Sequence, residues 1–169
     1  LFVGNLHGGV KNIKVLYQAF KTASKKIKNL KLMIIGKALD AEGQKFLVKL
    51  KKDKKVIVTG WLKAEKVIKA LGRAFVFVNT SKNEGHSLAV AEAAAVGVPL
   101  CLSKISSFTG VYQKAALYHE SEDYKQLAVN ILKYFNNKKL VETNSLAAKK
   151  IAGQFKLKKI KNQYFKVLT

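Results

Sequence analysis

The sequence is poor in several residue types whose scarcity limits what the protein can be. Its 169 residues include one cysteine, one proline, one methionine and one tryptophan. The single cysteine, Cys101 in the apolar run PLCLS, excludes an internal disulfide framework and indicates a reducing compartment. No apolar run approaches the roughly 18 residues of a membrane-spanning helix, and no secretory signal is visible. We therefore expect a cytoplasmic protein.

The length and the 49% content of hydrophobic residues predict a single globular domain over residues 1–169. The chain begins at Leu1 with a predicted strand and without an initiator methionine. We therefore expect it to be part of a longer protein.

Acidic residues are scarce, with 10 Asp and Glu against 32 Lys and Arg, a formal net charge of +22. All the basic residues except Arg73 are lysines, and they are spread over most of the predicted helices. Arginine is the residue that reads bases and phosphates bidentately, so nucleic acid is the least favoured partner. Two other interpretations stay open, namely solvated lysine faces and attraction to an anionic membrane surface at the inner face.

Short apolar runs alternate with helical patterns along most of the chain. Strands are predicted at residues 1–4, 30–36, 55–60, 74–79, 98–103 and 116–119. Helices are predicted at residues 15–23, 41–51, 64–71, 87–96, 123–135, 140–151 and 156–168. This alternation is typical of βαβ units. The fold class is therefore α/β, a Rossmann-like parallel sheet with helices on both faces, closed by C-terminal helices.

The first candidate site is the glycine-rich stretch GNLHGGVKN, from Gly4 to Asn12, after the first strand. A turn of this kind before a helix can hold a phosphate on backbone amides. It lacks the GxGxxG pattern, and Val10 stands where a Walker A loop needs lysine. Lys11 could supply a cation to a phosphate. An ordinary turn with a solvated lysine is the alternative.

The second candidate site contains Glu84 and Glu92, the only carboxylates between Lys66 and His119. Glu84 follows a predicted buried strand, and Glu92 lies about one turn into the next predicted helix. Ligands of open α/β sheets bind at this edge. Gly85 permits close approach of a ligand, and Glu92 could accept hydrogen bonds from a sugar diol. Alternatively, glutamates near a helix start simply complement its dipole.

The whole string around these glutamates is more specific than either residue. The pattern S-x-x-E-G-x-x-L-x-x-x-E-A-x-A-x-G-x-P runs from Ser81 to Pro99. It resembles the donor-binding half of the retaining family 4 glycosyltransferases, which have two Rossmann-like domains in a GT-B fold. The segments FVGNL, LKLMIIG, VIVTGWL and ALYHESEDYKQLA continue the likeness over essentially the whole chain.

The resemblance implies a role for each matching residue. Glu92 would bind the ribose hydroxyls of a nucleotide, and Glu84 would lie beside the donor sugar as a catalytic residue. Lys11 would neutralise the diphosphate leaving group as the second catalytic residue. The remaining donor-binding residues implied by the family are the loop residues Gly85, His86, Ser87 and Leu88, the first-strand turn Gly4 and Asn5, and Trp61 and Leu62 near the base.

The predicted function is donor binding in a retaining, metal-independent glycosyltransferase with a hexosyltransferase-like reaction. No cofactor is implied; the donor would be a nucleotide-sugar, with a UDP-sugar favoured, and the acceptor a glycan or lipid-linked molecule. The N-terminal acceptor domain of the family is absent, so we expect donor binding without activity alone. Asn5 stands where the family usually has arginine, which predicts weaker donor binding. His7, His86 and His119 do not have a metal-ligand spacing.

Two alternatives to a glycosyltransferase, from other functional classes, stay open. A non-catalytic nucleotide-sugar module is favoured by Asn5 and the absent domain, and a polyanion-binding protein by the lysine excess. A sugar-nucleotide epimerase of related fold fits the string from Glu84 to Pro99 poorly.

Overall fold

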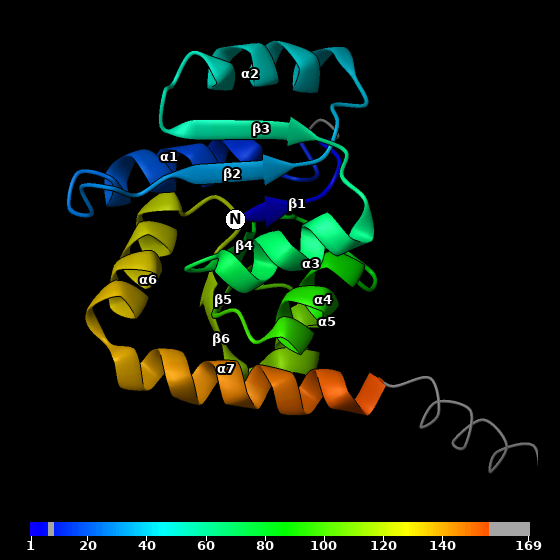
Figure 1. Ribbon diagram of the computed structural model, residues 1–169, viewed down its shortest axis with the longest axis vertical. Helices are drawn as coiled ribbons and strands as arrows, with labels where there is room; N and C mark the ends of the chain where they lie inside the picture. The colour runs from blue at the N-terminus through cyan, green and yellow to red at the C-terminus, as the bar shows by residue number, and fades with distance from the viewer. Residues whose placement is uncertain (7–8, 156–169) are drawn as a thin grey trace, which may run out of the picture.

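The computed structural model describes residues 1–6 and 9–155 of the chain (Figure 1). The helix that the sequence predicts at residues 156–168 lies outside the described residues. Within them, helices and strands alternate along the chain, as the sequence pattern predicts.

The strands form two parallel sheets of three strands each. Strands β1 (Phe2–Val3), β2 (Leu32–Ile35) and β3 (Val56–Gly60) make the first sheet. Strands β4 (Phe77–Asn79), β5 (Leu100–Ser103) and β6 (Ala116–His119) make the second.

Two backbone hydrogen bonds join the sheets at β1 and β4. The amino group of Leu1 donates to the Val76 carbonyl oxygen at 2.8 Å, and the Val78 N–H donates to the Leu1 carbonyl oxygen at 2.9 Å. The spatial order of the strands is therefore β3-β2-β1-β4-β5-β6. The strand order reverses between β1 and β4, and open α/β sheets bind ligands outside the carboxyl ends of the strands at such a point.

The buried apolar side chains form two clusters, and the helices fall into two groups, each packed with one of these clusters (Figure 1). Helices α1 (Ile13–Ala23), α2 (Ala41–Lys51) and α6 (Tyr124–Asn136) pack with the first cluster. Helices α3 (Ala64–Arg73), α4 (Leu88–Val96), α5 (Ser106–Tyr112) and α7 (Lys138–Ala152) pack with the second. Short 3-10 turns, η1 and η2, lie at Gln113–Ala115 and Gly153–Phe155. A parallel sheet between such layers is buried on both faces, which explains the nearly unbroken apolar runs of the strands.

Helix α1 shows how the pattern produces the packing. Val15, Leu16, Ala19, Phe20 and Ala23 recur on one face and are all buried. Full burial of an aliphatic or aromatic side chain of this size contributes about 1.5–3 kcal/mol. The stripe therefore fixes which face of α1 meets the sheet.

The expected fold class is confirmed, and every strand except β6 is shorter than predicted. Helix α4 ends as the sequence predicts, with Gly97 at its C-cap in the left-handed conformation (φ 86°) and Pro99 close behind. The sequence analysis missed α5. Its residues, SSFTGVY, include a glycine and two β-branched side chains, which have low helix propensity, and the helix is held by burial of Phe108 and Tyr112.

His119 ends β6 as a fully buried polar residue. Its Nδ1 lies 2.8 Å from the Glu120 carbonyl oxygen and its Nε2 lies 3.3 Å from the Asn79 carbonyl oxygen. Burial lowers the pKa of this imidazole below its ordinary value of 6.5, and it outweighs the two carbonyl contacts, which raise it. His119 is therefore held neutral in the folded protein.

This burial predicts a pH-dependent stability. Because the folded pKa is lowered, the unfolded state binds more protons as the pH falls below 6.5. The free energy of unfolding should therefore fall between about pH 7.5 and about pH 5.5, measured by urea denaturation. His119→Gln should lose less over this range, whereas the exposed His86→Gln control should lose as much as the wild type. An equal loss in the wild type and His119→Gln would contradict this assignment.

Candidate functional site

The two predicted catalytic residues meet at the carboxyl ends of β1 and β4. Lys11 Nζ lies 2.5 Å from Glu84 Oε1, although 73 residues separate them in the sequence. The side chains are 23% and 13% exposed, so the ion pair is shielded yet reachable from solvent. The structure thus brings together the two candidate segments that the sequence presented separately.

Two adjacent buried side chains at the end of β4 hold this ion pair in place. Thr80 Oγ1 donates to the Lys11 carbonyl oxygen at 2.8 Å, and Ser81 Oγ donates to Glu84 Oε1 at 2.9 Å. The Lys82 N–H also donates to the Val10 carbonyl oxygen at 2.9 Å. The chain after β4 is therefore fastened both to the Lys11 backbone and to the Glu84 carboxylate.

Ser81 also contacts a layer of buried polar side chains at the ends of β4 and β5. The Ser81 N–H donates to Asn79 Oδ1 at 2.9 Å, and Ser103 Oγ donates to the Asn79 carbonyl oxygen at 3.2 Å. Asn79, Ser81 and Ser103 are at most 2% exposed. Sequence reasoning did not assign Asn79, Thr80 or Ser103 to the site. The available signal was a polar residue at the end of each apolar strand, as in FVFVNTS and LCLS.

The surroundings keep Glu84 ionised. Burial by itself would raise the pKa of this carboxyl group, but hydrogen bonds from Lys11 and Ser81, the charge of Lys11 and a contact with Asn79 together lower it. The site therefore presents a fixed negative charge directly beside a lysine ammonium at neutral pH.

The two helices that begin beside the ion pair lack side-chain caps, as α3 and α5 also do. Helix α1 begins after Asn12 and α4 after Ser87, and neither N-cap side chain accepts a hydrogen bond from its helix. By contrast, Asp40, Asp123 and Asn137 cap α2, α6 and α7. The first-turn amides of α1 and α4 can therefore bind an anion at the helix ends.

Glu92 lies one turn inside α4, half-buried. Within the described part of the chain its carboxylate makes neither a hydrogen bond nor an ion pair. Leu88, at the start of the same helix, is 73% exposed. His86 packs edge-on against Phe155, with ring centroids 5.5 Å apart, at the end of the described chain. Gly85 has open space around its α-carbon, as close approach of a ligand requires.

The turn after β1, which contains Gly4 and Asn5, lies against the ends of β2 and β3. Asn5 Oδ1 accepts a hydrogen bond from the Lys37 N–H at 3.1 Å, and the Gly4 N–H donates to the Ile35 carbonyl oxygen at 2.9 Å. Gly36 has a φ of +147°, and a Cβ there would overlap the carbonyl group of Gly4. Gly36 thus lets the turn containing Gly4 and Asn5 close onto β2.

Trp61 and Leu62 follow directly after β3. The Gly36 N–H donates to the Gly60 carbonyl oxygen at 2.9 Å, which places the end of β3 beside the end of β2. Trp61 is 63% exposed and Leu62 is half-buried. The large exposed indole ring is thus available to a flat ligand at the same edge of the sheet as Lys11 and Glu84.

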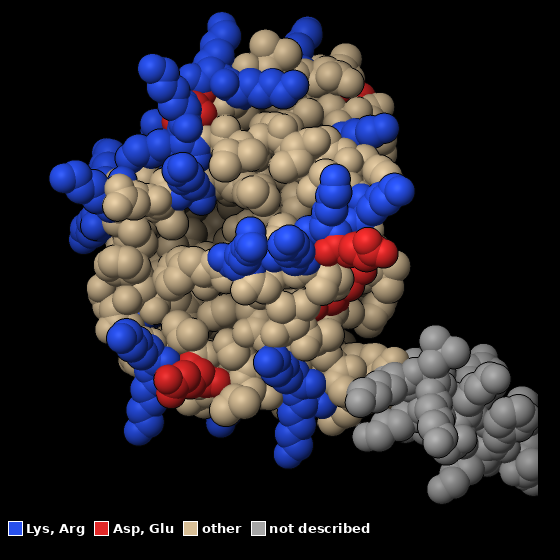
Figure 2. Space-filling model, in the orientation of Figure 1, with Lys and Arg blue, Asp and Glu red and all other residues tan. Residues whose placement is uncertain are grey.

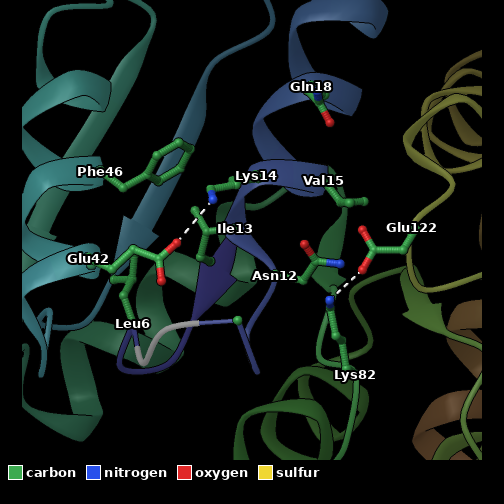
Figure 3. Close-up of a pocket in the computed structure, with 12 residues that line it drawn as sticks. Leu6, Asn12, Ile13, Lys14, Val15, Gln18, Glu42, Phe46, Lys82 and Glu122 are labelled. Atoms are coloured by element: carbon green, nitrogen blue, oxygen red, sulfur yellow. Dashed lines mark hydrogen bonds and ion pairs between the residues drawn. The ribbon is translucent and has the colours of Figure 1, made fainter.

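A cavity of about 350 Å³ opens beside the ion pair, between α1 and α2 (Figure 3). The ion pair Lys14–Glu42 stands on one side, and the ion pair Lys82–Glu122, 2.5 Å long, on the other. None of the residues predicted from the sequence to bind the donor lines this cavity. It nevertheless adjoins the predicted donor site at the same edge of the sheet, since its lining includes Asn12, the neighbour of Lys11 in the chain.

The described residues contain no group of three His, Cys, Asp or Glu side chains placed to hold a metal ion. Over the same residues, no helix has both the length and the apolar character needed to cross a membrane.

A parallel sheet with this strand order, and an ion pair at its reversal point beside two uncapped helices, defines a Rossmann-like domain that can receive an anionic ligand. The sequence profile of the family Glycosyl transferases group 1 matches residues 1–137. The chain belongs to this glycosyltransferase family. No protein of curated function matches it by sequence.

Solved structures of glycosyltransferases share the fold. A point mutant of Staphylococcus aureus TarM, in complex with fondaparinux, alpha-GlcNAc-glycerol and UDP, is 21% identical with a TM-score of 0.80. The match covers 98% of this chain and 34% of TarM, so the chain spans about a third of that protein. The C-terminal domain of the group 1 glycosyltransferase LpcC from Francisella tularensis is 20% identical with a TM-score of 0.77, covering 91% of this chain and 84% of that one.

The catalytic domain of cholesterol-alpha-glucosyltransferase from Helicobacter pylori is 22% identical with a TM-score of 0.75. That match covers 92% of this chain and 98% of the other. At these identities the likeness establishes the fold, which is one Rossmann-like half of a GT-B structure.

The close approach of β2 to the first-strand turn generates a stability prediction. Gly36→Ala forces a Cβ into the Gly4 carbonyl and strains the backbone, so it should lower the free energy of unfolding by about 2–4 kcal/mol in urea denaturation. Gly110→Ala in α5 is the control, because its Cβ would meet open space. The control should change stability by at most about 1 kcal/mol, in the stabilising direction. Equal stability of the two variants would show that the turn does not need Gly36.

Proposed function

We propose that this chain is the donor-binding domain of a retaining glycosyltransferase that transfers a sugar from a nucleotide-sugar to a glycan or lipid-linked acceptor. The observation that carries the proposal is the ion pair of Lys11 and Glu84 at the β1/β4 reversal point, flanked by the free helix ends of α1 and α4. Membership in the glycosyltransferase family supports it. The UDP in the TarM complex favours a UDP-sugar as donor.

In this proposal the diphosphate of the donor lies between Lys11 and the first amides of α4. Lysine has three N–H donors, so Lys11 can contact a phosphate oxygen while it still contacts Glu84. When the bond between the sugar and the diphosphate breaks, negative charge grows on the phosphate oxygens. The ammonium and the helix amides stabilise that charge in place, without first reorienting. The chain's own groups therefore supply the cationic side of the reaction without a metal ion.

Glu84 has the complementary role. The sugar ring acquires positive charge as the leaving group departs, and a carboxylate beside it stabilises that charge. The lowered pKa of Glu84 keeps it ionised for this purpose. Glu92, which has no partner among the described residues, would accept hydrogen bonds from the two ribose hydroxyls. Trp61 and Leu62 would contact the base.

The acceptor and half of the catalytic cleft would come from a second domain. In the proposed protein an N-terminal acceptor domain covers the edge that carries Lys11 and Glu84. The domain described here would then bind the donor but transfer little sugar alone. A lipid-linked acceptor would bring the protein to a membrane surface.

A second candidate function is a nucleotide-sugar binding module without catalysis. The observation that favours it is Asn5, whose side-chain oxygen is used by the Lys37 N–H and which supplies no positive charge. A charge-assisted hydrogen bond contributes about 1.5–3 kcal/mol, so a site with lysine alone would bind or activate the diphosphate less strongly than one with two cations.

Calorimetric titration with UDP, GDP, ADP and their common sugar derivatives tests the proposal. Moderately high salt should be used, because it screens the lysine surface. We expect a preference for one base, and Glu92→Ala should raise Kd at least about tenfold through loss of charged hydrogen bonds to the ribose. The matched control Glu142→Ala removes an exposed carboxylate of α7 and should leave Kd unchanged.

Equal, salt-sensitive binding of all the nucleotides, unchanged by Glu92→Ala, would contradict the donor site. It would mean that the lysine surface binds them without discrimination.

A further inference from the structure

The charges of the chain are separated between the two ends of the strands. Most of the carboxylates follow the carboxyl end of a strand or lie in the helix after it, at what we term the carboxyl edge. They are Asp40, Glu42, Glu65, Glu84, Glu92, Glu120, Glu122 and Asp123. The opposite end of the sheet, where helices lead back into strands, we term the amino edge.

The amino edge is dominated by exposed lysines. They lie in the connections from α1 to β2 and from α2 to β3, the last residue of α2 included, and Figure 2 shows them gathered on the upper left of the molecule. They are Lys25, Lys26, Lys28, Lys31, Lys51, Lys52, Lys54 and Lys55. Lysines near helix C-termini complement the helix dipoles, which accounts for a few of them but not for eight in two short connections.

Asp53 is the carboxylate within these connections, and it already accepts hydrogen bonds from neighbouring groups. It accepts hydrogen bonds from Lys21 Nζ at 3.1 Å, Tyr17 Oη at 3.0 Å and the Lys55 N–H at 3.0 Å. These contacts hold the pKa of Asp53 below its ordinary value, the backbone N–H of Lys55 contributing most. Asp53 therefore offsets one positive charge, that of Lys21 in α1, and the edge keeps a large positive excess.

An apolar cavity of about 590 Å³ opens at the same edge. Ile27, Met33, Ala70 and Val76 are among the apolar residues that line it. Its basic residues are Lys31, Lys66, Lys69 and Arg73. Among the described residues no carboxylate lines this cavity. Figure 2 shows a hollow beside α3 with basic side chains around it.

Two phenylalanines are exposed beside these basic residues. Phe75 is 40% exposed and Phe135 is 51% exposed, and both line the cavity. Their rings pack edge to face, with centroids 6.2 Å apart at an interplanar angle of 82°. Exposed aromatic rings next to cations are suited to the boundary between lipid headgroups and acyl chains.

We propose that the amino edge docks the protein on an anionic lipid surface. The lysines and Arg73 contact the headgroups, while Phe75 and Phe135 enter the headgroup–acyl boundary over the apolar cavity. This combination favours lipid over nucleic acid, because an apolar cavity fits hydrocarbon and because arginine, the main reader of nucleic acids, occurs there once. Docking by this edge leaves the carboxyl edge, with Lys11 and Glu84, turned away from the lipid, and of the two proposed acceptor classes it favours a glycan over a lipid-linked molecule.

Sedimentation of the 169-residue chain with vesicles tests this proposal. Binding should require anionic lipid, for example about a third phosphatidylglycerol in phosphatidylcholine, and should weaken as salt rises. Each lysine or arginine near such a surface strengthens partitioning about fivefold, so the combined variant Lys66→Gln, Lys69→Gln, Arg73→Gln should bind roughly a hundredfold more weakly. The matched control Lys104→Gln, Lys125→Gln, Lys150→Gln removes the same charge from exposed positions after β5, at the start of α6 and in the last turns of α7, and it should bind nearly as the wild type does.

The aromatic contribution has its own pair of variants. Phe135→Ser should weaken vesicle binding at least about fivefold, since an aromatic side chain leaves the interface. Leu146→Ser, at a residue of α7 that is 69% exposed, should have little effect. Unchanged thermal melting would show that each variant is folded.

Three outcomes would overturn the proposal. The first is an equal loss of binding in the two triple variants, which would indicate only overall charge. The second is equal binding to vesicles of phosphatidylcholine alone. The third is stronger binding to a single-stranded oligonucleotide than to anionic vesicles, unaffected by Phe135→Ser, which would assign the edge to nucleic acid.

Discussion

Thr80 and Ser81, buried side by side at the end of β4, connect the two sheets at the edge where a ligand would bind. Thr80 contacts the Lys11 backbone and Ser81 contacts the Glu84 carboxylate, so one dipeptide sets the distance between the two charges. Loss of the Thr80 hydroxyl would remove the hydrogen bond to the Lys11 carbonyl oxygen, and loss of the Ser81 hydroxyl would leave Glu84 Oε1 with the hydrogen bond from Lys11. The ion pair at the site is thus a product of the fold and is present without a ligand.

The buried polar layer beneath these hydroxyls links the ends of three strands. Asn79, Ser103 and His119 end three neighbouring parallel strands, and their hydrogen bonds converge on Asn79 and Ser81. Parallel strands expose their last carbonyl and amide groups at one edge, and polar side chains there satisfy these groups. The same requirement that stabilises the sheet therefore also positions Glu84. Stability and site geometry are linked at this edge.

The acidic and basic residues are concentrated at opposite ends of the strands. Carboxylates are few and most lie at the carboxyl edge, where helix N-termini favour negative charge, while lysines accumulate at the amino edge. A ligand with phosphates would be attracted to the whole molecule but held specifically only at the Lys11 edge, where backbone amides and Glu92 add directional hydrogen bonds. The distinction between general attraction and specific binding is therefore one of geometry.

Much of this arrangement could be predicted from residue patterns. The buried strands follow from unbroken Val, Ile and Phe runs, and the start and stop of α4 from Ser87, Gly97 and Pro99. The sequence predicts that Lys11 and Glu84 lie at the same edge of the sheet. It does not predict that they form an ion pair, because contact between side chains depends on tertiary packing. Helix α5 and the use of Asn5 by the Lys37 N–H were missed, because burial and backbone position decide both.

The most direct test of the central claim is the ¹H–¹⁵N amide spectrum of the chain during titration with UDP. If the reversal point binds the donor, the largest shifts should occur in residues 4–5, 11–14, 36–37, 60–62 and 84–92, and they should persist at high salt. Residues 25–31 and 51–55, at the lysine-rich amino edge, should not shift. Shifts confined to those lysine segments and abolished by salt would contradict the claim, because they would show that UDP binds the charged surface and not the Lys11–Glu84 site.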